Sequence, residues 1–454
     1  MVSELSYHVV IAGAGIAGAS LAYFLRNSGF KILLLDLKPF DRVGDKACGD
    51  AIGKHHIDEL KIPAPEGREL EGLVRGIDVY SPFEDVRYRV LGDGYEINRI
   101  AYTQKFIKEA IKSGVEFREK VRVLKPIIND GFVSGVVIRD GEEVKEVRTK
   151  IVIDATGVAR VLARQCPDEW PVSEELDPKD ANIAYREVRK LKEPIDEPEI
   201  LRIYVSNKVA PGGYWWFFPY SLKEGYVNVG LGVQGGVGNP HPKTQLYRYV
   251  LSRDIFKDSE LIEGGGAPVP TRRPLPSLVW NGFAVIGDAA YCVNPVHGGG
   301  KGSAMLSAFC VAEAVIEALN DGDYSAKKLW RANKCYMKKY GAKQAALDIF
   351  RMFLQQLSDE DLEYGMRRKI IKEEDLNVVS LKGDLELSVV EKAMRLLAGL
   401  RRPSLLLKLR AVAKYMDLMK RYYLNYPDSP DKLPAWKSGT DKILSVFRVK
   451  VIKS

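Results

Sequence analysis

A strand–turn–helix–strand pattern near the start of the chain constrains the fold more than any other feature of the sequence. An apolar run at residues 7–12 leads into a glycine-rich turn, after which a helical stretch and a second apolar run end at Asp36. Such a turn lets the backbone approach a pyrophosphate at a helix N-terminus, and the acid can accept hydrogen bonds from ribose hydroxyls. The pattern predicts a Rossmann-like dinucleotide-binding domain, with an unliganded glycine-rich turn as the alternative. The residues predicted to line the site are Gly13, Ala14, Gly15, Gly18 and Asp36.

Two later segments have the form of a strand that ends in small residues and an acid. They are KIVIDATG at 150–157 and GFAVIGDAAYCVNPVHGGGKG at 282–302. An acid at the end of a buried strand suits a ribose or ribityl hydroxyl, and a glycine-rich turn before a helix points N–H groups at negative charge. The N1–C2=O edge of a reduced flavin carries such charge, so these segments favour FAD over NAD. The residues concerned are Asp154, Gly157, Gly287, Asp288, Gly299, Gly300, Lys301 and Gly302.

Five consecutive aromatic residues occupy the middle of the segment GGYWWFFP, residues 212–219. On a strand, Tyr214, Trp216 and Phe218 lie on one face and the two intervening rings on the other. Three stacked rings beside a flavin would form a flat apolar slot for a substrate. Packing within a hydrophobic core is the alternative.

Cys48 lies in a short loop segment, Lys46–Gly53, directly after the predicted βαβ unit. A lone cysteine usually serves as a small buried apolar residue. Here its neighbours include Lys46, Gly49 and Asp50 rather than an apolar run. We therefore expect a functional role for this thiol in preference to simple packing.

The chain resembles flavoproteins of the p-hydroxybenzoate hydroxylase fold. The GxGxxG, ATG and GD segments follow one another in the order typical of that group, and the likeness covers about residues 1–345. The segments ACGDAIG and YxWxFP…GxG are similar to those of the geranylgeranyl reductases, above all the archaeal enzymes that saturate isoprenoid chains of membrane lipids.

This resemblance implies FAD as the cofactor and a loop that covers the flavin. It also implies that Arg99 and the backbone at Val123 contact FAD, with a solvated arginine at a helix start as the alternative for Arg99. Lys301 stands where an apolar residue is usual, which would place a cation near the flavin pyrimidine. The loop residues assigned to the cofactor are Ala47, Cys48, Gly49 and Ala51.

The fold class implied by the resemblance is α/β with α+β. It combines a discontinuous Rossmann-like FAD-binding domain of the p-hydroxybenzoate hydroxylase type, an antiparallel-sheet substrate domain and a helical C-terminal region. The expected boundaries are 1–75, 99–165 and 275–345 for the first, 76–98 and 166–274 for the second, and 346–454 for the third.

The function implied is reduction of isolated C=C bonds in a geranylgeranyl chain, carried by a diphosphate or a phospholipid. An isolated alkene has no carbonyl to accept charge, so hydride addition requires accompanying proton delivery. The rings of Tyr214, Trp216 and Phe218 are expected to hold the chain and stabilise developing positive charge, while reduced flavin supplies hydride. Cys48 is expected either to relay a proton or to tune the position of the flavin.

Two other functions stay open on the sequence. One is a flavin monooxygenase or halogenase of the same fold, because the WxWxIP motif of halogenases resembles YWWFFP. The other is a flavin-bearing lipid-binding protein without turnover. The electron donor is expected to be ferredoxin or NAD(P)H, since a basic protein suits an acidic ferredoxin and some hydroxylases of this fold bind NADPH without a second GxGxxG.

Positive charge is concentrated near the C-terminus. Residues 392–421 hold nine basic residues and one acid, Asp417, and this excess equals the net charge of +8 of the whole chain. A nucleic-acid partner is therefore not expected. Within this segment Leu405, Leu409, Val412, Met416 and Met419 form one helical apolar face. The basic residues, among them Arg401, Arg402, Lys408 and Arg410, lie largely off that face, so the helix either packs on the domain or contacts lipid phosphates at a membrane.

The cysteines and the N-terminal residues indicate where in the cell the protein is expected. The five cysteines form no CxxC pair, so neither a zinc site nor a secreted disulfide framework is expected. Cys310 and Cys335 lie at similar heights in two expected antiparallel helices, where they either pair or pack as free thiols. No basic region precedes the first apolar run, and uncharged stretches such as 209–222 are too short to span a membrane. We expect a cytoplasmic protein with a peripheral contact on the inner face of the membrane.

Overall fold

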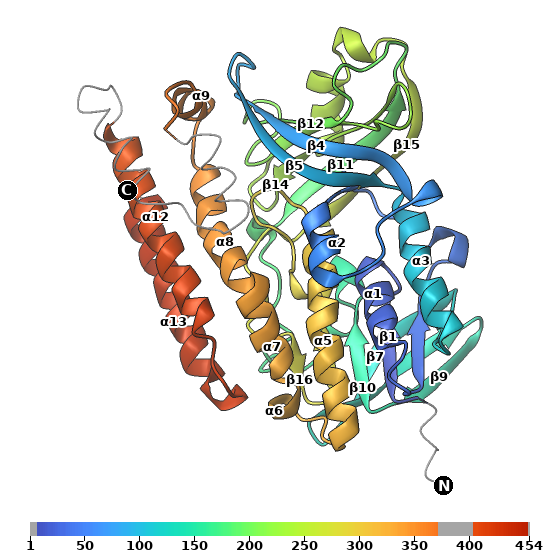
Figure 1. Ribbon diagram of the computed structural model, residues 1–454. Helices are drawn as coiled ribbons and strands as arrows, with labels where there is room; N and C mark the ends of the chain where they lie inside the picture. The colour runs from blue at the N-terminus through green and yellow to red at the C-terminus, as the bar shows by residue number, and fades with distance from the viewer. Residues whose placement is uncertain (1–6, 371–402, 453–454) are drawn as a thin grey trace.

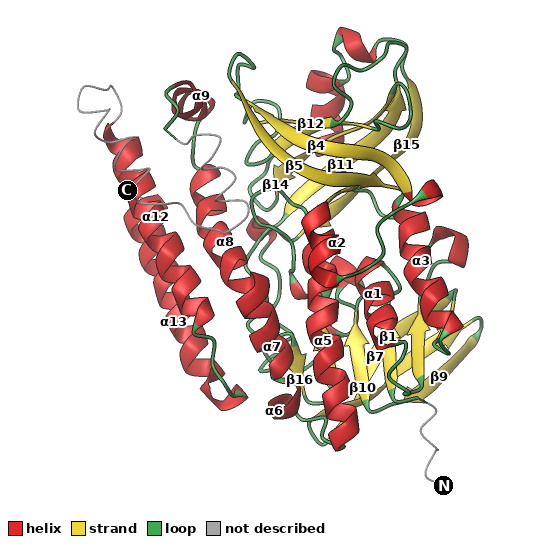
Figure 2. Cartoon of the chain, in the orientation of Figure 1, coloured by secondary structure: helices red, strands yellow, loops and turns green. Residues whose placement is uncertain are grey.

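A six-stranded sheet forms the base of the molecule in the computed structural model, which describes residues 7–370 and 403–452 (Figures 1 and 2). Five of its strands are parallel, and β1 and β2 are buried along their whole length, as expected when both faces of a parallel sheet are covered. In order across the sheet the strands are β16 (Val279–Trp280), β17 (Phe283–Val285), β10 (Ile151–Asp154), β1 (Val9–Ala12), β2 (Ile32–Leu35) and β6 (Glu116–Arg118).

Helices cover one face of this sheet, and a small antiparallel sheet contacts strands β10 and β2 (Figure 1). The covering helices are α1 (Ile16–Leu25), α3 (Arg99–Lys112) and α5 (Lys301–Asp321). Asn98 caps α3 by accepting a hydrogen bond from the N–H of Ala101, which confirms the predicted helix start. The small sheet consists of β7 (Val121–Asn129), β8 (Phe132–Asp140) and β9 (Glu143–Arg148).

A second large sheet of eight strands lies above the first, as Figure 2 shows. Its neighbours are antiparallel except for β12 and β4, which run parallel. In order the strands are β15 (Glu260–Val269), β11 (Asn182–Lys190), β14 (Tyr226–Gln234), β13 (Tyr214–Pro219), β12 (Ile200–Tyr204), β4 (Leu70–Tyr80), β5 (Arg87–Ile97) and β3 (Ala51–Gly53). Two short helices, α2 (Lys54–Leu60) and α4 (Pro242–Gln245), flank it.

This architecture confirms the predicted fold class: a parallel sheet, an antiparallel substrate-type sheet and C-terminal helices. The domain boundaries stay predictions. The expected boundary at residue 75 falls inside β4, and β3 also belongs to the second sheet, because these strands pair with β5 rather than with the parallel strands. The expected boundary at 345 falls inside α8 (Ala342–Leu354).

The C-terminal region is helical, with α9 (Asp359–Arg367), α12 (Pro403–Leu424) and α13 (Leu433–Phe447) beyond α8. The predicted apolar face of α12 is buried and packs on α8, with Val412, Met416 and Met419 fully buried. This confirms the packing interpretation of the helix. Arg401 and Arg402, which we expected on its basic face, lie outside the described residues.

A proline-rich stretch such as 426–439 is typical of a loop, but its second half is helical. A helix, α13, begins at Leu433, with Pro434 in its first turn. Proline suits this position because the first N–H groups of a helix have no intrahelical partner. The helix runs back along α12 (Figure 1), and Trp436 contacts Tyr423 and Tyr426.

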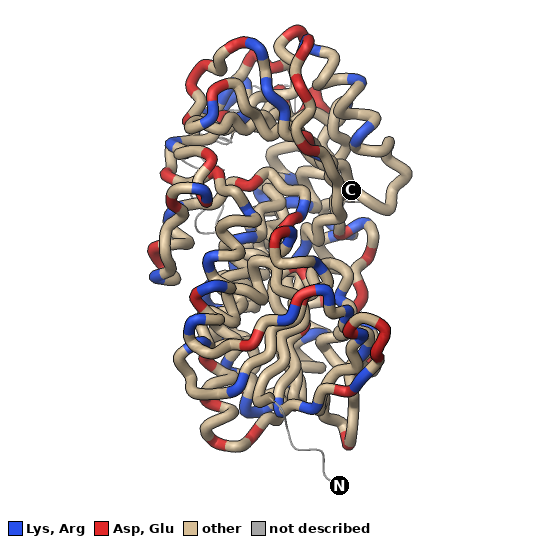
Figure 3. The backbone as a smooth tube through the Cα atoms, turned by 90° about the vertical axis from the view of Figure 1, so that its right-hand side faces the viewer, with Lys and Arg blue, Asp and Glu red and all other residues tan. Residues whose placement is uncertain are grey.

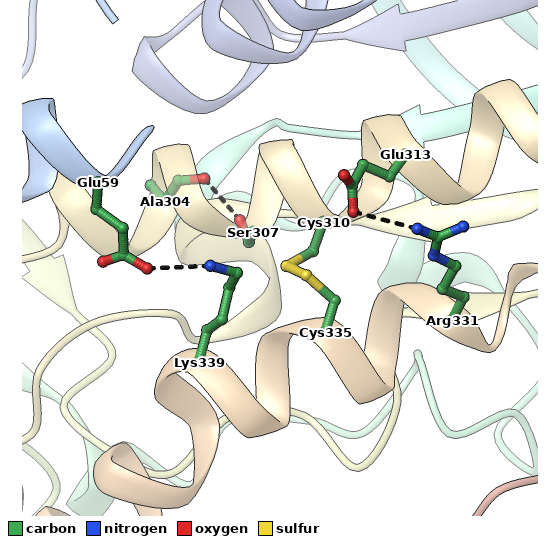
Figure 4. Close-up of a disulfide and its surroundings, with 8 residues drawn as sticks. All are labelled: Glu59, Ala304, Ser307, Cys310, Glu313, Arg331, Cys335 and Lys339. Atoms are coloured by element: carbon green, nitrogen blue, oxygen red, sulfur yellow. Dashed lines mark hydrogen bonds and ion pairs between the residues drawn. A yellow bond between two sulfur atoms is a disulfide. The ribbon is translucent and has the colours of Figure 1, made fainter. Parts of the chain in front are cut away.

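A disulfide joins the long helix α5 to α7 (Arg331–Tyr336), which follows the short α6 (Ala326–Leu329). Cys310 and Cys335 have Cα atoms 5.6 Å apart, which confirms that these two cysteines pair. Figure 4 shows the bond flanked by ion pairs, Glu313 with Arg331 and Glu59 with Lys339.

Among the described residues, α5 alone is long and apolar enough to be considered as a membrane-crossing helix. This reflects length and composition only, because 78% of its most apolar window is buried inside the protein. Burial to this extent is typical of a core helix, and α5 packs between α1 and α7.

Candidate functional site

The glycine-rich turn after β1 has two glycines that the packing requires and one that faces open space. Gly13 has φ +96°, and a Cβ there would lie 2.5 Å from the carbonyl oxygen of Ala155. A Cβ on Gly18 would overlap the carbonyl oxygen of Gly13. Gly15, by contrast, has no atom within 4 Å of its would-be Cβ. The turn therefore packs β1, α1 and the loop after β10 together and leaves room for a ligand at Gly15, as a dinucleotide site needs.

Asp36 lies at the end of β2 and is directed towards this turn. Its carboxylate accepts hydrogen bonds from the N–H of Ala14 (2.7 Å) and of Lys38 (2.8 Å). The N–H of Val121 donates to the carbonyl of Asp36, which brings β7, and with it Val123, to the same edge. The predicted adenosine-side residues thus gather at the carboxyl ends of the parallel strands, where ligands bind in such sheets.

Asp154 has a structural role that the sequence did not indicate. It is fully buried, and its two oxygens accept four hydrogen bonds, from the Thr156 N–H and hydroxyl and from the N–H groups of Leu162 and Ala163. The carboxylate therefore holds the loop after β10 in shape, and its binding to the cofactor stays a prediction. Gly157, in the same loop, has φ +67° and open space around it.

The segment after β17 brings Gly287 and Asp288 against the start of α1 and the start of α5. A Cβ on Gly287 would lie 2.8 Å from the Cβ of Ala17. The turn after β17 is therefore in contact with the first turn of α1. Asp288 forms an ion pair with Lys46. Burial alone would raise the pKa of Asp288, but Lys46 holds it below its usual value, so the carboxylate is ionised at neutral pH.

The predicted glycine run forms the N-terminus of α5 beside Asp288. A Cβ on Gly300, the N-cap, would lie 3.4 Å from a carboxylate oxygen of Asp288. Gly299 lies against the ring of His297, and Gly302 lies against the ring of His56. The predicted residues 287–302 are therefore brought together, although the two histidines were not predicted.

Cys48 meets the buried ammonium of Lys301, which reaches it from α5. The Lys301 Nζ lies 3.2 Å from the Cys48 Sγ and 3.4 Å from a carboxylate oxygen of Asp50. Burial raises the pKa of the Cys48 thiol, but Lys301 and Arg99 outweigh it, and the pKa lies below that of an ordinary thiol. Lys301 was expected beside a flavin pyrimidine; the structure directs its ammonium to Cys48 and Asp50.

Arg99 carries a buried polar atom that suits a bound ligand. Its Nε is buried and has no hydrogen-bond partner in the described part of the chain. Its charge lowers the pKa of both Cys48 and Asp288, so the guanidinium lies within electrostatic range of both groups. A buried donor without a partner costs about 1–3 kcal/mol, which an acceptor on a ligand would offset. Together with the open space at Gly15, this arrangement fits a flavin dinucleotide.

The aromatic face predicted on residues 214–218 is present on β13 and is joined to the Cys48 loop. The indole N–H of Trp216 donates to Asn228 (3.0 Å), whose amide donates to the carbonyl of Cys48 (2.8 Å). A Cβ on Gly49 would lie 2.9 Å from the ring of Phe218. The predicted catalytic groups Cys48, Tyr214, Trp216 and Phe218 therefore belong to one cluster.

The rings on this face are tilted rather than stacked, which corrects the expected flat slot. Tyr214 and Trp216 meet at an interplanar angle of 60°, and Trp216 and Phe218 at 35°. The twist of a strand rotates successive side chains on one face, so the three rings do not lie in one plane. Trp216 and Phe218 are buried in a small core with Val74 and Leu201, and the partly buried Tyr214 packs against it. The two intervening rings, Trp215 and Phe217, lie in the separate core on the other face, as predicted.

Three histidines, one of which contacts Tyr214, and a lysine within their electrostatic range were not predicted. Burial lowers the pKa of His56 to about 3 and that of His297 to about 4, so both imidazoles are neutral near pH 7. The rings of His55 and His56 lie 4.0 Å apart, and the hydroxyl of Tyr214 donates to the carbonyl of His297. Burial also lowers the pKa of Lys343 to about 8. The His-His doublet directly after the Cys48 loop was the available signal.

No cluster of three or more potential metal ligands occurs among residues 7–370 and 403–452.

The fold is that of flavin-dependent oxidoreductases. It matches a geranylgeranyl bacteriochlorophyll reductase-like protein from Thermoplasma acidophilum with a TM-score of 0.76, at 24% identity, over 89% of this chain and 99% of the other. It also matches the myxobacterial chondrochloren halogenase with a TM-score of 0.63, at 17% identity, over 90% of this chain and 97% of the other. At these identities the likeness concerns the fold alone.

Sequence comparison identifies the family. Residues 180–269 match the geranylgeranyl reductase catalytic domain, and residues 8–176 match the model named glucose inhibited division protein A. The chain is 51% identical to the digeranylgeranylglycerophospholipid reductase of Sulfolobus acidocaldarius over 98% of both chains, and 30% identical to that of Methanosarcina acetivorans over 79% of this chain and 87% of the other. The protein belongs to the digeranylgeranylglycerophospholipid reductase family.

Proposed function

We propose that this protein is an FAD-dependent reductase that saturates isolated C=C bonds in the geranylgeranyl chains of a phospholipid. The observation that carries the proposal is the 51% identity, over nearly the whole of both chains, to a digeranylgeranylglycerophospholipid reductase. The match of residues 180–269 to the geranylgeranyl reductase catalytic domain, which contains the aromatic strand β13, supports the same substrate class. Free geranylgeranyl diphosphate is the alternative substrate.

The residues that would hold FAD lie at three places around the parallel sheet. The turn at Gly13–Gly15 and Asp36 suit the adenosine diphosphate half. Asp288 and the N-terminus of α5 suit the ribityl and flavin half, and the unpartnered Nε of Arg99 supplies a donor between them. When bound and reduced, the flavin supplies a hydride.

The chain's own residues account for the remaining needs of the reaction. The tilted rings of Tyr214, Trp216 and Phe218 can hold an isoprenoid chain and stabilise positive charge on the tertiary carbon. Cys48 can release its thiol proton, because Lys301 lies 3.2 Å from the sulfur and stabilises the thiolate. The lowered pKa of Cys48 favours the proton-relay role over the positioning role.

Anaerobic single turnover tests the proposed function. Protein with chemically reduced FAD is mixed with digeranylgeranylglycerophospholipid under argon, with geranylgeranyl diphosphate in a parallel sample. We expect the flavin to reoxidise and the lipid to gain two hydrogens for each bond reduced, measured by absorbance and mass spectrometry. An absolute requirement for oxygen, with a hydroxylated or halogenated product, would instead show monooxygenase or halogenase chemistry.

Replacing Cys48 by serine should preserve FAD content and slow alkene reduction. Because a serine hydroxyl does not ionise near neutral pH, we expect loss of general-acid catalysis of about 10²-fold. The measurement is the rate of flavin reoxidation by lipid under anoxia. Cys166→Ser is the matched control, since Cys166 is a buried thiol in the loop after β10 rather than in the Cys48 loop, and burial raises its pKa to about 12. Equal rates in Cys48→Ser and the wild type would remove the thiol from the reaction.

The outer face of α12 supports a peripheral contact with the cytoplasmic surface of the membrane. Leu407, Leu418 and Leu424 are 63%, 42% and 50% exposed, although they are large and apolar. Arg410 and Lys414 are exposed beside them, and Figure 3 shows how basic positions are distributed over the chain. Exposed apolar residues among cations are typical of helices that lie on anionic membranes.

The triple variant Lys408→Glu, Arg410→Glu, Lys414→Glu should bind anionic vesicles more weakly. Each basic residue near such a surface contributes about 1 kcal/mol, so the partition coefficient should fall at least roughly tenfold. Flotation with phosphatidylglycerol–phosphatidylcholine vesicles measures it, and rising salt should reduce the difference. The control is Lys108→Glu, Lys112→Glu on α3, which are exposed but lie on another surface. If both variants float like the wild type, α12 serves packing only.

The electron donor is proposed to be a ferredoxin or NAD(P)H. The net positive charge of the chain supports an acidic protein donor, because opposite charges accelerate association. Comparing flavin reduction by reduced ferredoxin and by NADPH under anoxia distinguishes the two.

A further inference from the structure

Glu96 is a fully buried carboxyl group next to the Cys48 loop, and the mechanism above does not use it. It lies on β5 with no accessible surface, and neither carboxyl oxygen has a hydrogen-bond partner. In the sheet it pairs with Ala51 on β3 and with Gly72 on β4. The N–H of the next residue, Ile97, donates to the carbonyl of Asp50, so β5 is tied directly to the segment that follows Cys48.

The charged groups around Glu96 leave it without a cation of its own. Asp50 is buried and forms ion pairs with two cations. Its carboxylate oxygens lie 3.4 Å from the Lys301 ammonium nitrogen and 3.9 Å from an Arg186 guanidinium nitrogen. Glu71, on the neighbouring strand β4, pairs with Lys223 and accepts from the amide of Asn98. The positive charges near Glu96 are therefore directed to other carboxylates.

Burial raises the pKa of Glu96 well above its usual value, and the charge of Asp50 raises it further. Ionisation of Cys48 or Glu71 acts in the same direction, while Lys301 opposes them. Tyr220 also faces this cluster, and its own pKa is raised by burial. A buried carboxyl with no partner is far more stable uncharged than ionised. Glu96 therefore holds a proton at neutral pH, in the electrostatic range of Cys48 and Lys301.

We propose that Glu96 is the internal proton reserve that reloads Cys48 after each reduction step. This inference rests on the proposed function. In the step, the π bond of the alkene breaks, one carbon gains a hydride from the reduced cofactor, and the other gains the thiol proton of Cys48. The thiolate left beside Lys301 then takes a proton from the Glu96 carboxylic acid by way of the Asp50–Lys301 cluster. The Glu96 carboxylate regains its proton from solvent, so each bond reduced consumes one hydride and one solvent proton.

A purely structural role accounts poorly for this side chain. An apolar residue of similar size would fill the same place without burying two acceptors that nothing satisfies. Asp50 adds a second unusual feature, because it adopts φ +60° at the turn that carries Cys48 towards β3. An unpartnered buried carboxyl group and an unfavourable backbone conformation thus occur together beside Cys48. Cys48 is the only accessible free thiol among the described residues, since Cys166 and Cys292 are buried.

Glu96→Gln tests the proposal, because glutamine keeps the shape and the neutrality of the carboxylic acid but holds no transferable proton. The first reduction event after mixing reduced protein with lipid should stay within about twofold of the wild-type rate, since Cys48 already carries its proton. Repeated turnover should fall roughly tenfold or more, in line with lost proton transfer. Glu96→Asp should restore part of the repeated turnover. Glu71→Gln is the control, because Glu71 is a buried carboxyl group with a cation partner. It should not change the ratio between the rate of the first reduction event and the rate of repeated turnover.

A second measurement needs no turnover. The rate at which iodoacetamide alkylates Cys48 is followed against pH in the oxidised protein by mass spectrometry. If Glu96 is uncharged, Glu96→Gln leaves this pH profile and the melting temperature at pH 7 unchanged. If Glu96 is ionised, the substitution removes a buried negative charge, shifts the profile to lower pH and raises the melting temperature, and the proposal is wrong. Equal single and repeated turnover in Glu96→Gln would also overturn it, whereas a wild-type protein that never reoxidises with lipid would instead refute the proposed function.

Discussion

Replacing Gly18 by alanine should produce a protein that is less stable and holds little FAD, whereas Gly15→Ala should lose FAD affinity alone. A Cβ at Gly18 overlaps the carbonyl oxygen of Gly13, so α1 has to move away from β1. Forcing a methyl group into such a packed position costs roughly 1–3 kcal/mol and displaces the turn that receives the pyrophosphate. At Gly15 the added methyl meets no protein atom within 4 Å and takes only space reserved for the ligand.

Two measurements separate these effects. FAD content after purification and the dissociation constant for added FAD report on the site, and thermal melting of the FAD-free protein reports on packing. We expect FAD binding to weaken at least roughly tenfold in both variants, because both methyl groups hinder the approach of the pyrophosphate. Of these two variants, only Gly18→Ala should have a lower FAD-free melting temperature. Gly29→Ala is a control for loss of stability outside the site, because its φ of +78° strains an alanine; it should lower the melting temperature and leave FAD affinity unchanged. Normal FAD affinity in Gly15→Ala would place the pyrophosphate elsewhere.

Removing the disulfide between α5 and α7 should cause the largest loss of stability that leaves the site intact. The bond closes a loop with a sequence separation of 25 residues. Constraining an unfolded chain over a loop of this length is worth about 3 kcal/mol on the chain-entropy account. We therefore expect the Cys310→Ser, Cys335→Ser variant to melt well below the wild type while it retains FAD, because Cys310 lies in the middle of α5 rather than at its N-terminus at Lys301.

Reductant supplies the control for this prediction. Dithiothreitol should lower the melting temperature of the wild type towards that of the double variant and leave the double variant unchanged. The ion pairs Glu313–Arg331 and Glu59–Lys339 remain in both proteins. The difference in melting temperature between them therefore reports on the disulfide alone. A double variant as stable as the wild type would show that helix packing alone holds α5 and α7 together.

The sequence by itself determined the features that depend on local backbone chemistry and on periodicity. Gly13 and Gly18 were predictable because the βαβ turn admits no side chain there, whatever the rest of the fold does. The segregation of Trp216 from Trp215 followed from the two-residue period of a strand. The buried face of α12 followed from the helical period of its apolar residues.

Only the tertiary structure decided which side chains meet, because the order of strands in the sheets is not written in any local pattern. Lys301 reaches Cys48 across 253 positions, and Lys46 reaches Asp288 across 242. Only the fold shows that Asp154 holds its own loop, because four nearby donors fold back onto its carboxylate. Glu96 carried no signal at all on an exposed-looking strand of alternating residues. Its chemistry arises from burial between β3 and β4, since a carboxyl group changes its protonation when the fold removes both water and cations from its surroundings.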